Sequence, residues 1–182
     1  MGKTLWTENR AESVYELRSA ARGRRLDLSG LPLKDVDLLA DWPELRYLKE
    51  LDLSKYEALE NVDGVSGLTC LRRILLRECG ALSNVNGLAG LLLLDEVDLF
   101  LCESLANVNA LAGLTQLTRL DLSFCSSLPD VNILAGLTQL TVLHLDWCSR
   151  CKLNCPESAK GINVVNLFSI MRSSYIHDIT YP

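Results

Sequence analysis

The chain has 182 residues, of which 48% are hydrophobic and 23% charged. This length fits a single domain, and the composition excludes a disordered or collagen-like chain. The formal net charge of −5 argues against nucleic acid as a partner, because phosphate binding needs clustered lysine and arginine. Leucine supplies 39 residues while aromatic side chains make up only 6%, which indicates one packing arrangement repeated many times.

A helix over about residues 7–22 is the first predicted element. Apolar residues recur there at helical spacing, namely Ala11, Val14, Leu17 and Ala21. Gly23 follows as a stop signal. We expect residues 1–25 to form a helical N-terminal cap that covers the first repeat.

Six repeat units are predicted over residues 26–148. Segments of the LDLS type begin at residues 26, 51, 74, 97, 120 and 143, so the spacing is 25 residues once and then 23 residues four times. Identical residues recur at fixed positions, as in Cys79, Cys102, Cys125 and Cys148, and in Gly67, Gly90, Gly113 and Gly136. Such a period predicts a stack of equal coils.

Each unit is predicted to contain a strand and a short 3₁₀ turn. In L-x-L the two leucines point inward and the middle residue points outward, because strand side chains alternate. Apolar residues then recur every third position, which suits a 3₁₀ turn. We expect the turns to be capped by Asp63, Asn86, Asn109 and Asn132, and to end at left-handed residues of the glycine column.

The repeat unit L-x-x-L-x-L-x-x-C resembles the leucine-rich-repeat superfamily, as in Leu117, Leu120, Leu122 and Cys125. Its 23-residue period and cysteine column are similar to internalin-like and kinetoplastid-type leucine-rich-repeat proteins. The resemblance implies an α/β solenoid shaped as a horseshoe segment. A parallel sheet would form its concave face, with short 3₁₀ or helical turns on its convex face, and partner proteins would bind to the concave face.

The leucine period ends at Cys148. Residues 149–182 are predicted to form an irregular C-terminal cap, with an apolar group between Ile162 and Met171. Together the two caps and the repeats give one leucine-rich-repeat domain over residues 1–182.

A protein-binding patch is predicted on the outward positions of the last strands. Two of the three phenylalanines and one of the three tryptophans fall there, and exposed apolar groups rimmed by charge mark interaction sites. The predicted site residues are Leu75, Asp98, Phe100, Leu101, Asp121, Phe124, His144, Asp146 and Trp147. The alternative is that the rings fold down against the C-terminal cap as part of the core.

An aspartate column occupies the middle of four L-x-L segments, at Asp27, Asp52, Asp98 and Asp121. One interpretation is a solvated face whose acids pair with Lys49, Arg73 or Arg119. The other is a site for a basic partner or a cation. Residues 26–147 carry eight basic and eighteen acidic groups, so we expect a partner that is basic and has an apolar anchor.

Neither a metal site nor a catalytic site is expected. Cys148, Cys151 and Cys155 with His144 have the nominal ligand types for zinc, but Cys148 belongs to the inward cysteine column, whereas His144 lies on the outward side of its strand. The only other histidine is His177, and no phosphate-binding or metalloprotease motif occurs. We therefore expect no cofactor, no metal and no enzymatic activity.

The predicted function is a non-catalytic protein interaction module, acting as a scaffold, adaptor or regulator. We expect a monomer in the cytoplasm, because the seven cysteines are an odd number, the N-terminus lacks a signal peptide and no segment is long enough to span a membrane. One alternative is a substrate-recognition or structural subunit of a larger complex such as a ubiquitin ligase. Another is a pathogen effector or surface-type leucine-rich-repeat protein.

Overall fold

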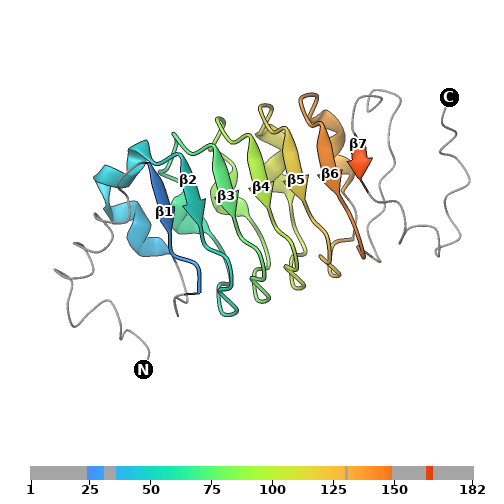
Figure 1. The fold of residues 1–182 in the computed structure, drawn as a ribbon, viewed down its shortest axis with the longest axis horizontal. Coiled ribbons are helices and arrows are strands. Elements are labelled where there is room, and N and C mark those ends of the chain that lie inside the picture. Colours follow the sequence, from blue (N-terminus) through green and yellow to red (C-terminus); the bar gives the residue numbers. More distant parts are fainter. Residues whose placement is uncertain (1–23, 31–35, 130, 149–162, 166–182) are drawn as a thin grey trace, which may run out of the picture.

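The computed structural model describes residues 24–30, 36–129, 131–148 and 163–165. Within these residues, seven short strands form one parallel sheet in chain order, each pairing with the next (Figure 1). The strands are β1 (Arg25–Asp27), β2 (Glu50–Asp52), β3 (Arg73–Leu75), β4 (Glu96–Asp98), β5 (Arg119–Asp121), β6 (Val142–His144) and β7 (Asn163–Val165). Equivalent residues of successive repeats are register partners, as Leu26 is with Leu51. The predicted solenoid is therefore confirmed.

In the described connections, six 3₁₀ turns return the chain from one strand to the next, behind the sheet in Figure 1. They are η1 (Asp37–Asp41), η2 (Pro43–Tyr47), η3 (Asp63–Val65), η4 (Asn86–Leu88), η5 (Asn109–Gly113) and η6 (Asn132–Gly136). The first repeat holds two of them, η1 and η2, which accounts for its greater length. No helix in the described part of the chain is long and apolar enough to cross a membrane.

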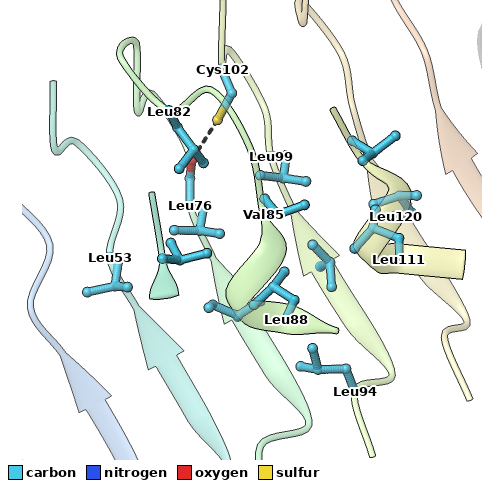
Figure 2. Packing of buried hydrophobic residues seen from close by; sticks show 14 of the residues in the cluster. Leu53, Leu76, Leu82, Val85, Leu88, Leu94, Leu99, Cys102, Leu111 and Leu120 are labelled. Atoms are coloured by element: carbon cyan, nitrogen blue, oxygen red, sulfur yellow. Dashed lines mark hydrogen bonds between the residues drawn. The ribbon is translucent and has the colours of Figure 1, made fainter. Parts of the chain in front are cut away.

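The leucine columns fill the space between the sheet and the turns. The central residue of each of the first six strands is buried, and so are the apolar residues that recur every third position after it. In the fifth repeat these are Leu120, Leu122, Leu128, Val131 and Leu134. Figure 2 shows side chains from neighbouring coils interdigitating in this way. Each coil therefore buries its apolar residues against the next coil, and one coil alone has no closed core.

Four buried cysteines of the described residues form hydrogen bonds between repeats at the bends after the strands. The thiol of Cys102 donates a hydrogen bond to the backbone carbonyl of Leu76 in the preceding repeat, with a sulfur to oxygen distance of 3.0 Å (Figure 2). Cys79, Cys125 and Cys148 make the same contact with Leu53, Leu99 and Leu122. Tyr56 replaces cysteine in the second repeat, and its buried hydroxyl donates to the carbonyl of Leu28. The column thus gives these carbonyls a hydrogen-bond donor from the next repeat. The carbonyls of Leu99 and Leu122 also accept from the backbone N–H groups of Cys102 and Cys125.

The glycine column is not left-handed, so that prediction is wrong. The third residue after each of the first six strands carries the positive φ instead, at Gly30, Lys55, Glu78, Leu101, Phe124 and Trp147. The chain bends here, three residues after the last strand residue that pairs in the ladder. The tight bend that needs a left-handed residue therefore lies at the strand end and not at the end of the 3₁₀ turn.

Capping of the turns also differs from the prediction. The Oδ1 atoms of Asn61, Asn84 and Asn107 accept hydrogen bonds from the backbone N–H groups two residues later, which belong to the first residues of η3, η4 and η5. The acceptor thus comes from two residues before each turn, because a short asparagine side chain reaches the N–H of residue i+2.

Two other glycines are needed for the close approach of neighbouring coils. A β-carbon on Gly87 would lie 2.0 Å from the backbone oxygen of Val62, and one on Gly64 would lie 2.0 Å from that of Val36. The equivalent residues in the next repeats are Ala110 and Ile133, where the 3₁₀ turns are five residues long instead of three. Glycine therefore sets the tight spacing of η1, η3 and η4.

The sheet continues beyond the six predicted strands. Strand β7 pairs in parallel with β6, with Val164 opposite Leu143, in a segment that was expected to be irregular. The rest of the predicted C-terminal cap and the predicted N-terminal helix lie outside the described residues.

Candidate functional site

The sheet face is the surface formed by the outward side chains of the strands and of the bends that follow them. It consists of four parallel rows, each with one residue from each repeat, because equivalent residues are register partners across the sheet. The rows are the first strand residues, the last strand residues, and the second and third residues after each strand. The nine predicted site residues all lie on β3 to β6 or on the bends after them. The structure therefore brings them onto one surface.

The aspartate row has a structural role that the sequence analysis did not predict. The Oδ1 atoms of Asp52, Asp98 and Asp121 each accept a hydrogen bond from the backbone N–H two residues later, over 2.9, 3.1 and 2.8 Å. Asp27 does the same with Ser29 and also accepts from its hydroxyl, and these hydrogen bonds lower the pKa of Asp27. The acids thus close the bend that leads to the left-handed residue.

In the third repeat, the hydrogen bond to an aspartate is replaced by one to a side chain of the preceding repeat. Leu75 stands in the aspartate position, and the N–H of Arg77 instead donates to the Oγ atom of Ser54, over 3.3 Å. Ser54 belongs to the preceding repeat and is buried. The bend therefore keeps its acceptor while Leu75 adds an apolar, half-buried group to the sheet face.

Asp98 lies in the most strongly charged part of the face. Its carboxylate is 3.6 Å from the guanidinium of Arg77, and its register partner on β5 is Asp121. Burial is the main cause that raises the pKa of Asp98, and the negative charges of Asp121 and Glu96 raise it further. Among the described residues the aspartates do not pair with Lys49, Arg73 or Arg119. Asp98 pairs with Arg77 instead, and Arg73 pairs with Glu96.

Three aromatic rings form a continuous stack at the edge of the sheet face. Phe100 and Phe124 meet edge to face with their centroids 5.3 Å apart, and Phe124 stacks on Trp147 with centroids 6.1 Å apart and planes at 17°. The guanidinium of Arg77 lies over Phe100, 5.1 Å from the ring centre. We call Phe100, Phe124 and Trp147 the aromatic ladder.

The aromatic ladder lies outside the buried core. None of its three rings belongs to the cluster of buried hydrophobic residues. Phe100 and Phe124 are half-buried, and Trp147 is 65% exposed. The rings pack on one another along the edge of the sheet. Apart from β7, the C-terminal cap against which they could fold as part of the core lies outside the described residues, so both interpretations stay predictions.

The backbone under the aromatic ladder is itself unusual. Leu101, Phe124 and Trp147 have φ values of 61°, 63° and 57°. A residue with a β-carbon in this region costs roughly 1–2 kcal/mol relative to the right-handed region. The first repeat has Gly30 here and avoids this cost. Lys55 and Glu78 have the same conformation, so the left-handed bend belongs to the repeat itself, and glycine is the residue that avoids its cost.

His144 and Asp146 complete the predicted site at β6 and its bend. The Nδ1 atom of His144 is 4.0 Å from the Oδ2 atom of Asp121, and both His144 and Asp146 are half-buried. In a serine hydrolase the histidine lies between the serine and the acid. Here Asp121 lies between His144 and the backbone N–H of Ser123, and this order does not activate a hydroxyl.

The cysteines are arranged as buried thiols. Burial raises the pKa of Cys79 to about 11, and it raises the pKa of Cys102 and Cys125 further. The described residues contain no group of three or more metal-ligating side chains. Cys151 and Cys155, the other members of the nominal zinc motif, lie outside the described residues, as does His177.

Comparison with known proteins identifies the fold. An internalin (inlF) from Listeria monocytogenes is similar at a TM-score of 0.50 and 20% sequence identity, over 75% of this chain and 44% of that one. An internalin C2 from the same organism gives a TM-score of 0.49 and 20% identity, over 82% and 83% of the two chains. A leucine-rich-repeat protein from Leptospira interrogans gives 0.31 and 18%, over 85% and 57%.

The likeness to the inlF internalin, together with the parallel sheet and the 3₁₀ turns, shows that the chain has the leucine-rich-repeat fold. The chain spans less than half the length of the inlF internalin. No protein-family model matches the sequence, and no curated protein matches it.

Proposed function

We propose that this leucine-rich-repeat solenoid is a non-catalytic protein interaction module, a scaffold, adaptor or regulator that binds its partner through the sheet face. The aromatic ladder and the charged groups around it form the contact surface. The observation that carries the proposal is the stack of three rings outside the buried core, two half-buried and one exposed, in a chain that has only six phenylalanine and tryptophan residues. Exposed aromatic residues of this kind are the usual energetic centres of protein interfaces.

One further feature supports this surface. The rings stack on one another, so they lose little side-chain entropy when a partner covers them.

The partner is proposed to be basic and to carry an apolar anchor. The segment from residue 26 to residue 147 has a net charge of −10, from eight basic and eighteen acidic groups. This charge would steer a basic protein toward the solenoid, and the association rate would fall as salt rises. An association rate with the purified partner that does not change with salt would contradict this part of the proposal.

The test is capture of partners by the full chain and by matched variants. Trp147→Ala and Phe124→Ala remove the aromatic ladder. The control is the double variant Leu92→Thr with Leu93→Gln, which gives this repeat the Thr-Gln pair found at residues 115–116 and 138–139. Leu92 and Leu93 are 56% and 41% exposed, and they precede β4, at the sheet edge opposite the aromatic ladder.

We expect wild type and the control variant to capture the same protein and the ladder variants to lose it. Trp147→Ala should shift Tm by less than about 4 °C, which corresponds to about 1 kcal/mol or less for a chain of this size. Capture that survives loss of the rings would contradict the proposal. A large fall in Tm in Trp147→Ala would instead assign the ring to the folded core.

We propose further that the chain acts in the cytoplasm as a monomer, without cofactor, nucleic acid or membrane as partner. The hydrogen bonds of the cysteine column support a reducing compartment, because each requires a protonated thiol. Labelling of free thiols in protein isolated from its native source tests this: oxidised cysteines in the column would contradict it. A role in a larger complex or as a pathogen protein stays a prediction, since likeness at 20% identity shows only the fold.

A further inference from the structure

A row of alternating charges crosses the sheet face just before the aspartate row. The first residues of β1 to β5 are Arg25, Glu50, Arg73, Glu96 and Arg119, which are register partners in that order. Opposite charges on neighbouring strands stabilise a sheet. Two pairs form, Arg25 with Glu50 at 3.6 Å and Arg73 with Glu96 at 3.0 Å.

The alternation stops at Arg119. Its register partner on β6 is Val142, whereas continued alternation of charge would place an acidic residue there. Arg119 is exposed, and within the described ranges it makes no ion pair or side-chain hydrogen bond. The row of alternating charges therefore ends in an arginine that has no acidic register partner on β6.

The acids near Arg119 already have other partners. Glu96 pairs with Arg73. Asp121, on the same strand as Arg119, accepts the N–H of Ser123 and faces His144. The net negative charge of the whole solenoid governs steering at long range, whereas a close contact depends on the group that is left unpaired at the surface. At this end of the sheet face that group is a cation.

The break in the charge row lies on the same repeats as the aromatic ladder. Arg119 begins β5, and Phe124 follows the end of the same strand. Arg119 and Phe124 are five positions apart, or at most about 17 Å at about 3.3 Å per residue, and the left-handed bend after β5 shortens this distance to about the length of four extended residues. An extended segment lying along β5 would span this distance with side chains four residues apart, which point to the same side.

We infer that the docking segment of the partner is an extended peptide that places a carboxylate on Arg119 and an apolar side chain, about four residues away, on the aromatic ladder. This inference rests on the proposed function and gives the chemistry of the contact. The partner's aspartate or glutamate supplies the acid that β6 lacks. Arginine suits this contact, because its guanidinium binds a carboxylate through two parallel hydrogen bonds.

Selection of a random 12-residue peptide library on the immobilised full chain tests the inference. We expect enriched peptides to carry Asp or Glu about four residues from an aromatic or aliphatic residue. Arg119→Gln should weaken the best of these peptides about tenfold, as loss of a charge-assisted hydrogen bond does. Arg119→Glu should enrich Lys or Arg at the acidic position.

Lys55→Glu is the matched control. Lys55 is also an exposed cation of the sheet face without an ion pair among the described residues, and it lies three repeats away. Its left-handed backbone accepts glutamate, because Glu78 has the same conformation one repeat later. The control should bind the selected peptides as wild type does, and each variant should keep the wild-type Tm within about 4 °C.

The outcomes separate this inference from the proposed function. Peptides that are lost in Trp147→Ala but bind Arg119→Gln at full strength would overturn the inference and leave the proposed function standing. Enrichment of Lys or Arg on the wild-type chain would overturn the inference in the same way. Failure to enrich any peptide, or binding that none of the variants affects, would count against both.

Discussion

Replacement of Gly87 by alanine tests the spacing between the coils of the solenoid. The new methyl carbon would lie 2.0 Å from the oxygen, 2.6 Å from the carbonyl carbon of Val62 and 2.8 Å from the Cα atom of Asp63. All three are backbone atoms, so no side chain can rotate away. Turns η3 and η4 must therefore move apart by about 1 Å or more, given carbon to oxygen contact distances of about 3.3 Å.

The loss of stability follows from the packing contacts between coils that this movement separates. Insertion of one methyl group into a packed core costs about 1–3 kcal/mol, and a clash with backbone atoms belongs at the upper end of that range. The shift also separates Val62 and Leu88, which are fully buried. We expect Gly87→Ala to lower the free energy of unfolding by about 3 kcal/mol.

Gly90→Ala is the matched control, three residues away in the same coil. A β-carbon there meets no atom within 4 Å, and Gly90 does not have a positive φ. Alanine reduces the entropy of the unfolded chain, so we expect stabilisation of about 0.4–1 kcal/mol. The two variants should therefore differ by about 3–4 kcal/mol, which is about 6–16 °C in Tm for a chain of this size.

Urea unfolding followed by circular dichroism measures both variants. The refuting result is a free energy of unfolding for Gly87→Ala within 0.5 kcal/mol of that for Gly90→Ala, a margin set by the usual effect of surface substitutions. Such a result would mean that η4 can adopt the five-residue form seen in η5 without loss of stability. In η5 the residue equivalent to Gly87 is Ala110. The tight spacing would then be a consequence of the sequence around the turn and not of glycine.

Three further predictions concern the column that holds the bends. Tyr56→Phe leaves the buried carbonyl of Leu28 without its donor, so we expect a loss of about 1–1.5 kcal/mol in the free energy of unfolding by urea titration; an unchanged value would show that the bond is not needed. Burial raises the pKa of the Cys79 thiol from 9.0 to about 11, so its contribution is complete below pH 9 and is lost as pH rises toward 11. Cys79→Ala should therefore reduce the fall in stability over that range by about 1.4 kcal/mol per pH unit, whereas equal slopes would argue against a buried thiol. In native protein, iodoacetamide should modify the half-exposed Cys70 at least about 100-fold faster than the buried Cys102, as mapped by mass spectrometry; similar rates would contradict the packing of the column.

The sequence predicted the position of the candidate site more completely than its contacts. All nine predicted residues lie on β3 to β6 or on the bends after them. For the residues within the strands, the L-x-L pattern fixes which side of the strand each one occupies. The pattern did not show that Asp98 pairs with Arg77, since this ion pair joins different rows of adjacent repeats. It also missed Arg119 as an unpaired group, because the missing acid becomes visible only when β5 and β6 are aligned in register.

The aspartate row shows the same limit. Spacing alone allowed a solvated face, ion pairs or a cation site, and the structure adds hydrogen bonds to the N–H groups two residues later. A signal was present in the sequence, since Asp-x-Ser recurs at residues 27–29, 52–54 and 121–123. This spacing is typical of a side chain that closes a turn on its own backbone.

The sequence by itself determined the period, the inward columns and the parallel stacking of coils. Each repeat places the equivalent residue in the same environment, so apolar residues that recur at a fixed position are all buried between the stacked coils. Only the tertiary structure decided which residue is left-handed, which charges pair and how the rings meet. Phe100 and Phe124 stand one position apart in their repeats, yet their rings touch, because the left-handed bend turns the second ring back along the sheet edge. Contacts between repeats depend on the register and twist of neighbouring coils, and a one-dimensional pattern does not contain them.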